Sequence, residues 1–336
     1  MKSKLGAALV AGGMTLSAST ALAQETLVFG MSNPEMHPVN TRVITPWIQA
    51  INADSPDTLT LDMRYGPTLV GPGNFYDRVI DDVVQVVWGM TVFDPGRFPR
   101  ALVSTLPFMV PNAELGSAAL CALHAQGAFG AEMDGIVPLL FVEFPQASIS
   151  LNGIAITSLE GLSGLKVLTS SPVGAGIIQA YGGAPISIPL PDQYEALQRG
   201  TAEGTLINFT AFPGFRLDEV TTDHFVVPGG GALGLVFMSR DGWDALSDDA
   251  RAVLERHSGC DASREAGVRV DAWEADSQAQ VAALPGHTMT YATSEQIAEL
   301  EARVGPAMVA GFAARVEGGE QLIADFRAAI AAAQAE

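Results

Sequence analysis

The chain has 336 residues, of which 48% are hydrophobic and 16% are charged, and its formal net charge is −19. This composition is typical of a soluble globular protein with an acidic surface. Such a surface repels nucleic acid and anionic lipid, so both are poor partners. A mature chain of roughly 310 residues exceeds one typical domain, which favours two domains.

The first 23 residues have the pattern of a secretory signal peptide. Lys2 and Lys4 form a short positive region, an apolar run of small residues follows, and Ala-Leu-Ala occupies 21–23. The apolar run is too short to span roughly 30 Å of hydrocarbon, which disfavours a membrane anchor. We therefore predict cleavage after Ala23 and export to the periplasm.

Cysteine and histidine usage argues against a metal site. The two cysteines, Cys121 and Cys260, lie in alanine-rich segments of helical character. Export leaves a disulfide between them open, but this context favours two buried free thiols. Two cysteines cannot form an ordinary zinc site, and none of the five histidines lies at ligand spacing from another. We expect neither metal nor cofactor.

Strand and helix patterns alternate through the first part of the chain. Buried or alternating apolar runs predict strands at 26–30, 59–65 and 83–88. Helices are predicted around 43–51 and from a cap at Asn74 through Asp82. This order indicates an α/β sheet with largely parallel strands.

The pattern continues in the middle of the chain. Strands are predicted at 166–168, 186–188 and 205–209. Ser171 and Pro172 mark one helix start, and Asp192 is the expected cap of a second helix that ends at Gly200.

The last third of the chain is predicted to be mainly helical. The glycine run 229–231 leads into a strand at 233–238, which we interpret as a return to the first domain. Apolar residues then recur at steps of three or four through 297–316, which predicts a long helix kinked near Pro306.

Motifs of enzymatic chemistry are not found. Gly174 and Gly176 follow a strand and open a helix, but Gln179 occupies the third glycine position of a dinucleotide fingerprint. The sequence contains no nucleophile elbow, phosphate loop or zinc-protease motif. A secreted hydrolase would need a nucleophile and base that the sequence does not reveal, so we do not expect an enzyme.

Five stretches resemble the solute-binding proteins of tripartite ATP-independent periplasmic (TRAP) transporters, in the order that the family has them. They are 88–108, 158–167, 194–204, 217–221 and 243–247. The second contains Leu162-Ser163-Gly164-Leu165-Lys166-Val167, and the third contains Ala196-Leu197-Gln198-Arg199-Gly200 with Glu203-Gly204.

The resemblance implies a two-lobed α/β periplasmic binding protein of type II-like fold. Lobe one would comprise 24–145 and 233–273, lobe two 146–232, and helices in 274–336 would pack across both. The implied function is capture of a small organic solute between the lobes and delivery to TRAP membrane subunits, with the chain acting as a monomer. A binding protein for an ABC transporter or a sensor shares this design and is the alternative.

One departure from the family concerns the ligand. The family usually carries an arginine directly after the lysine motif, where it pairs with a substrate carboxylate. Here that position is Leu168. Either another group replaces the arginine, such as Arg64 or the hydroxyls near Leu168, or the ligand is not a simple carboxylate.

Ten residues are the predicted ligand contacts. Aromatic faces, amides and hydroxyls at matched loops and strand ends would hold the solute. The predicted set is Trp88, Asn208, Tyr65, Phe108, Phe144, Leu168, Thr169, Ser171, Phe212 and His37.

Overall fold

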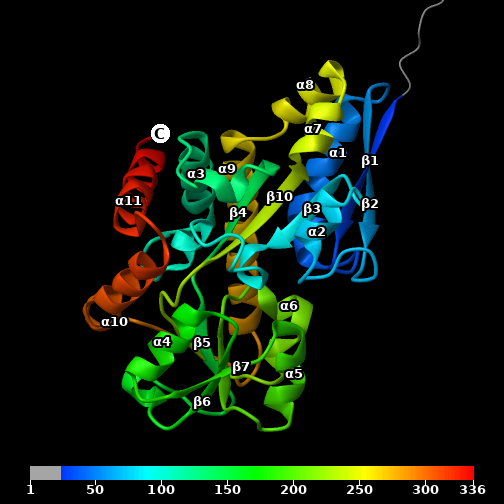
Figure 1. Ribbon diagram of the computed structural model, residues 1–336. Helices are drawn as coiled ribbons and strands as arrows, with labels where there is room; N and C mark the ends of the chain where they lie inside the picture. The colour runs from blue at the N-terminus through cyan, green and yellow to red at the C-terminus, as the bar shows by residue number, and fades with distance from the viewer. Residues whose placement is uncertain (1–23) are drawn as a thin grey trace, which may run out of the picture.

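The computed structural model describes residues 24–336. The predicted signal peptide, residues 1–23, lies outside the described residues. Figure 1 shows two lobes, one above the other, with each lobe built around its own sheet. The prediction of a two-lobed α/β fold is confirmed.

The sheet of the first lobe has the strand order β2-β1-β3-β10-β4. β1 pairs in parallel with β2 and β3, whereas β10 is antiparallel to both β3 and β4. The chain thus returns from the second lobe through β10 and enters the middle of the first sheet. The bounds are β1 (Glu25–Met31), β2 (Leu59–Tyr65), β3 (Val86–Met90), β4 (Ile136–Phe144) and β10 (Ala232–Ser239).

The sheet of the second lobe has the order β11-β9-β5-β8-β6-β7. Its edge strand β11 comes from the C-terminal part of the chain, which was predicted to be helical. The bounds are β5 (Ser148–Leu151), β6 (Lys166–Thr169), β7 (Ala184–Ser187), β8 (Gly204–Ile207), β9 (Asp223–Val226) and β11 (Thr288–Tyr291).

Helices cover both sheets. The first lobe carries α1 (Thr45–Asp54), α2 (Phe75–Ile80), α3 (Ala113–Ala125), α7 (Arg240–Ala245) and α8 (Asp248–Arg256), and a π-helical turn at Asn40–Ile44 precedes α1. The second carries α4 (Pro172–Ala180), α5 (Leu190–Gln198) and α6 (Ala211–Phe215). The long α9 (Cys260–Ala282) runs from one lobe to the other, α10 (Ser294–Arg315) packs on α4, and α11 (Gly319–Ala335) packs on α3.

Two predicted helix caps differ from the structure. The Asn74 side chain accepts a hydrogen bond from the Gly71 N–H, so it closes the preceding turn instead of capping α2. α5 begins at Leu190 after Pro189, which places Asp192 inside the first turn. There its charge still favours the helix N-terminus.

The prediction of two free thiols is wrong, because Cys121 and Cys260 form a disulfide. Their Cα atoms are 5.2 Å apart although the sequence separation is 139 residues. Cys121 lies on α3 and Cys260 begins α9, and these two helices pack side by side. Sequence context describes each cysteine alone and therefore misses a contact made by tertiary packing.

Removal of this disulfide is expected to destabilise the protein. Replacing both Cys121 and Cys260 by alanine frees a loop of 139 residues in the unfolded chain, which should cost about 2–5 kcal/mol of the free energy of unfolding. Urea denaturation measures this loss. A reductant should lower the midpoint of the wild type and leave the double variant unchanged; a reductant effect on both would contradict the assignment.

Candidate functional site

The segments that follow the carboxyl ends of β1 and β8 meet between the lobes. In α/β sheets, ligands bind outside the carboxyl ends of strands, where loops converge. The loop after β1 carries His37, and the segment after β8 carries Asn208, Thr210 and α6. Both segments lie against α9, so this junction is the candidate site.

Five aromatic rings line up across the junction. Trp88 and Phe144 have ring centroids 6.3 Å apart, Phe144 and Trp273 6.1 Å, and Trp273 and His37 6.2 Å. His37 then reaches Phe215 of the second lobe at 5.8 Å. We call these five residues the aromatic group. All four contacts are edge-to-face, so each pair sets the edge of one ring against the face of the next.

His37 is neutral in this environment. Burial lowers its pKa to about 4. The Val39 N–H donates to His37 Nδ1 at 3.2 Å, so the remaining proton sits on Nε2. Within the described chain, His37 Nε2 is buried without a hydrogen-bond partner, and so is the indole nitrogen Nε1 of Trp273.

Glu274 anchors the second lobe to α9. Its carboxylate accepts hydrogen bonds from the Phe209 N–H at 3.1 Å and the Thr210 N–H at 2.7 Å. Burial raises the pKa of Glu274 to about 7, against the lowering effect of these backbone donors. Asn208 ties the same segment to the hinge, because its Nδ2 donates to the Pro145 carbonyl at 3.2 Å.

Two crossing segments join the lobes and pair with each other. The Ala147 N–H donates to the Gly230 carbonyl at 2.9 Å, and the Gly229 N–H donates to the Ala147 carbonyl at 2.8 Å. The side chain of Gln146 adds a clamp: its Oε1 accepts from the N–H groups of Phe108 and Gly230, and its Nε2 donates to the Val110 carbonyl. This hinge fixes how the strand ends face each other.

A buried carboxyl group lies beside the hinge. Glu143 is fully buried, and neither carboxyl oxygen has a hydrogen-bond partner within 3.5 Å among residues 24–336. Burial raises its pKa well above the ordinary value, and the facing Ser104 hydroxyl and Ala232 N–H lower it by less. Burial thus favours the neutral, protonated form of Glu143 in the folded protein.

Four other predicted contacts lie in the second lobe, where Phe215 of the aromatic group packs against the apolar cluster that holds two of them. Leu168 and Phe212 are buried in an apolar cluster with Leu197 and Phe209. The Thr169 hydroxyl accepts from the Ser171 N–H, and the Ser171 hydroxyl accepts from the Gly174 N–H to cap α4. Their role as ligand contacts stays a prediction.

Tyr65 and Arg64 end β2 in the first lobe. Tyr65 is half-buried, and Arg64 pairs with Asp62 on the surface. Arg64 was one candidate to replace the arginine that the family has at position 168. In the structure its guanidinium is engaged in the ion pair with Asp62.

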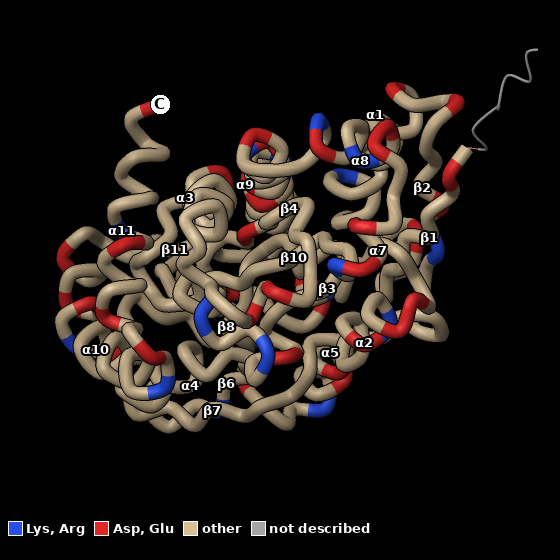
Figure 2. The backbone as a smooth tube through the Cα atoms, turned by 45° about the horizontal axis from the view of Figure 1, so that its top comes forward, with Lys and Arg blue, Asp and Glu red and all other residues tan. Residues whose placement is uncertain are grey.

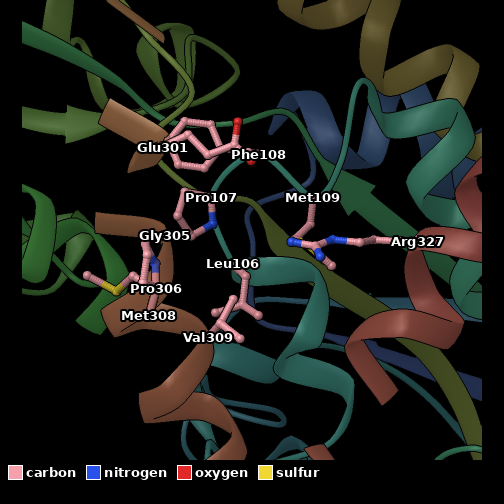
Figure 3. Close-up of a pocket in the computed structure, with 10 residues that line it drawn as sticks. All are labelled: Leu106, Pro107, Phe108, Met109, Glu301, Gly305, Pro306, Met308, Val309 and Arg327. Carbon is pink, nitrogen blue, oxygen red and sulfur yellow. The ribbon is translucent and has the colours of Figure 1, made fainter. Parts of the chain in front are cut away.

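Phe108 lies in a different hollow. A cavity of ≈ 290 Å³ separates its loop from α10 and α11, and Arg327 extends into it from α11 towards Met109 (Figure 3). Phe108 adopts the left-handed region at φ 67°, where a bulky side chain is strained. The cavity is lined by Leu106, Pro107, Phe108, Met109, Glu301, Gly305, Pro306, Met308, Val309 and Arg327.

The site residues that sequence reasoning missed are Trp273, Phe215, Glu274 and Gln146. Each sits in a helix or hinge segment without a motif of its own. The one signal in the sequence of α9 is the tryptophan of the Trp273-Glu274 pair. A tryptophan in a largely polar helix predicts that the side chain is buried, but it does not predict which residues it contacts.

The distribution of charged residues does not point to a further binding site. Asp and Glu are spread over both lobes and outnumber Lys and Arg, 37 to 18 (Figure 2). Across residues 24–336, no three His, Cys, Asp or Glu side chains gather as a metal ion would require. None of the helices in this part of the chain has the length and apolar character needed to cross a membrane.

The family model for bacterial extracellular solute-binding proteins, family 7 (DctP), matches residues 29–314. The chain belongs to this family. It is a TRAP solute-binding protein, as the ordered motifs predicted, and this family consists of transport receptors rather than enzymes.

Similar proteins match over nearly the whole chain. A marine metagenome TRAP protein specific for aromatic acid ligands, solved with 3-hydroxybenzoate, has a TM-score of 0.85 and 24% identity over 92% of this chain and 99% of its own. A TRAP protein from Rhodoferax ferrireducens T118, solved with copurified benzoate, has a TM-score of 0.85 and 24% identity over 93% and 99%. The "outer membrane transporter protein TsaT" of Comamonas testosteroni is 22% identical over 91% of this chain and 92% of its own. The two structures support the fold.

We expect Leu168→Arg to destabilise this TRAP solute-binding protein. Leu168 is fully buried among apolar side chains, so a guanidinium there would be an unpaired buried charge and should cost about 3 kcal/mol or more. Lys166→Arg on the same strand is exposed and serves as the control, with an expected change within about 0.5 kcal/mol. A folded Leu168→Arg variant that binds an organic acid more tightly would contradict this placement.

Glu143→Gln is expected to stabilise the protein at about pH 8 and to matter little near pH 4. As pH rises past the ordinary glutamate pKa, the unfolded chain loses its proton while buried Glu143 keeps it. The unfolded state then binds fewer protons, so stability falls as pH rises. Gln removes this loss, so we expect the variant to gain stability over the wild type as the pH rises from 4 to 8.

Urea denaturation at both pH values tests this expectation for Glu143. Glu317→Gln, at an exposed position, is the matched control. An equal effect of Glu143→Gln at both pH values would show that the group ionises normally.

Proposed function

We propose that this TRAP solute-binding protein captures a small organic solute with a flat apolar body, held against the aromatic group. The observation that carries this proposal is the run of aromatic rings from Trp88 to Phe215, which bridges the two lobes at the carboxyl ends of β1 and β8. The two similar structures that hold benzoate and 3-hydroxybenzoate support a ligand of this shape.

Capture works by closure of the lobes. In this proposal, lobe one comprises 24–145 and 233–273, lobe two comprises 146–232, and 274–336 packs across both. The paired crossing segments act as the hinge, and bound solute shifts the population towards the closed form. That form docks on the TRAP membrane subunits and delivers the solute, with the chain acting as a monomer.

Export precedes this role. The positive start, the apolar run and the Ala-Leu-Ala before Gln24 support a signal peptide that is cleaved after Ala23. The Cys121–Cys260 disulfide supports an oxidising compartment such as the periplasm.

A thermal-shift screen tests solute capture. A ligand that binds only the folded state stabilises it by about 2.7 kcal/mol at a hundredfold excess over its Kd. We expect at least one flat organic compound to raise the melting temperature, in a library of aromatic and aliphatic acids, amides, amines, polyols and betaines. If the whole library leaves the melting temperature unchanged, solute capture is not the function.

A further inference from the structure

Two buried N–H groups in the aromatic group have no acceptor within residues 24–336. One is Nε2–H of His37, whose Nδ1 is already occupied by the Val39 N–H. The other is Nε1–H of Trp273, which can only donate. A buried donor without a partner costs free energy in the folded state, so such groups are rare unless something binds them.

The rings that carry these two donors are neighbours and come from different elements. The His37 and Trp273 rings are 6.2 Å apart and nearly perpendicular, at 87°. His37 Nε2 faces Gly214 on α6 of the second lobe, where an added Cβ would come within 2.9 Å of it. Because Gly214 has no side chain, α6 of the second lobe can pack closely against the edge of the His37 ring. Phe144 and Phe215 flank the pair.

Other unpaired buried atoms do not form such a pair. Those of Glu143, Arg78 and Arg251 belong to the first-lobe sheet and its helices, and that of Ser258 lies in the turn between α8 and α9. Asn40 Oδ1 follows His37 in the chain and is also unpaired, but it is an acceptor. Among residues 24–336 no lysine or arginine is buried, so the junction holds no buried cation for an anionic ligand.

We propose that His37 Nε2–H and Trp273 Nε1–H together bind the carboxylate of an aromatic monocarboxylic acid, in place of the arginine that Leu168 replaces. A carboxylate only accepts hydrogen bonds, and its two oxygens match two N–H donors on adjacent rings. The ring of the acid would lie against Phe144 and Phe215. This inference rests on the proposed function and names its solute class.

The test uses benzoate and 3-hydroxybenzoate as probes, with calorimetric titration of the whole mature chain. His37→Phe and Trp273→Phe each remove one N–H and keep an aromatic ring. We expect each variant to raise the Kd for benzoate about tenfold or more, because one of two charge-assisted hydrogen bonds is lost. Trp47→Phe is the matched control: the Trp47 Nε1–H donates to the His257 carbonyl in the first lobe, and its loss should leave the Kd within about twofold.

A second readout separates ligand binding from a structural role. His37→Phe removes the unpaired Nε2–H and also the Nδ1 acceptor of the Val39 N–H, so the ligand-free melting temperature should fall somewhat. The benzoate-induced rise, measured from each variant's own ligand-free melting temperature, should shrink in addition. His37→Gln restores an N–H donor and should recover part of the affinity.

Two results would overturn the inference. One is unchanged benzoate affinity in both His37→Phe and Trp273→Phe. The other is a wild type that binds neither acid, or binds benzylamine more tightly than benzoate. If neither acid binds but other compounds in the library raise the melting temperature, solute capture stands and only the carboxylate assignment fails.

Discussion

The hydrogen-bonded pair of crossing segments at Ala147 and Gly230 determines how the two sheets face each other. These segments are short, so small changes in their geometry move a whole lobe. Gln146 lies in one crossing segment and reduces that freedom by binding the other segment at Gly230 and the first-lobe loop at Phe108 and Val110. The strand ends that carry His37 and Asn208 meet only because this connection holds the sheets in register. The contact between His37 and Phe215, which joins the aromatic group to the second lobe, depends on it.

Polar groups at the junction fall into two kinds. The Glu274 carboxylate is saturated by backbone N–H groups of the second lobe, so it fastens α9 to that lobe. The His37 and Trp273 nitrogens are buried but unsatisfied. A junction built only for rigidity would pair all of these groups. The Glu274 carboxylate has its hydrogen-bond partners, whereas the two N–H groups of His37 and Trp273 beside it have none. This arrangement is typical of a binding site.

Sequence patterns identified most of the strands, because alternation and buried apolar runs reflect local burial, but they missed β4, β9 and β11. They also identified the family, since its motifs occupy turns whose residues are locally constrained. The pairing of Cys121 with Cys260 and the place of Trp273 could not be predicted, because both depend on how α9 packs after the chain has crossed twice between lobes. Leu168 shows the same limit: its position in a motif was clear, but whether its side chain meets the cleft or the core is decided by packing with Leu197 and Phe209.

The C-terminal region contributes an edge strand, β11, to the sheet of the second lobe, in addition to the helices that pack on both lobes. This strand follows α9 and pairs in parallel with β9 along Thr288–Tyr291. A chain shortened after Ala282 would leave the N–H and C=O groups of β9 exposed along the rim of the second sheet. Exposed strand edges recruit other strands and cause aggregation. The last 54 residues, 283–336, thus protect the second lobe from self-association, although most of them lie outside its sheet.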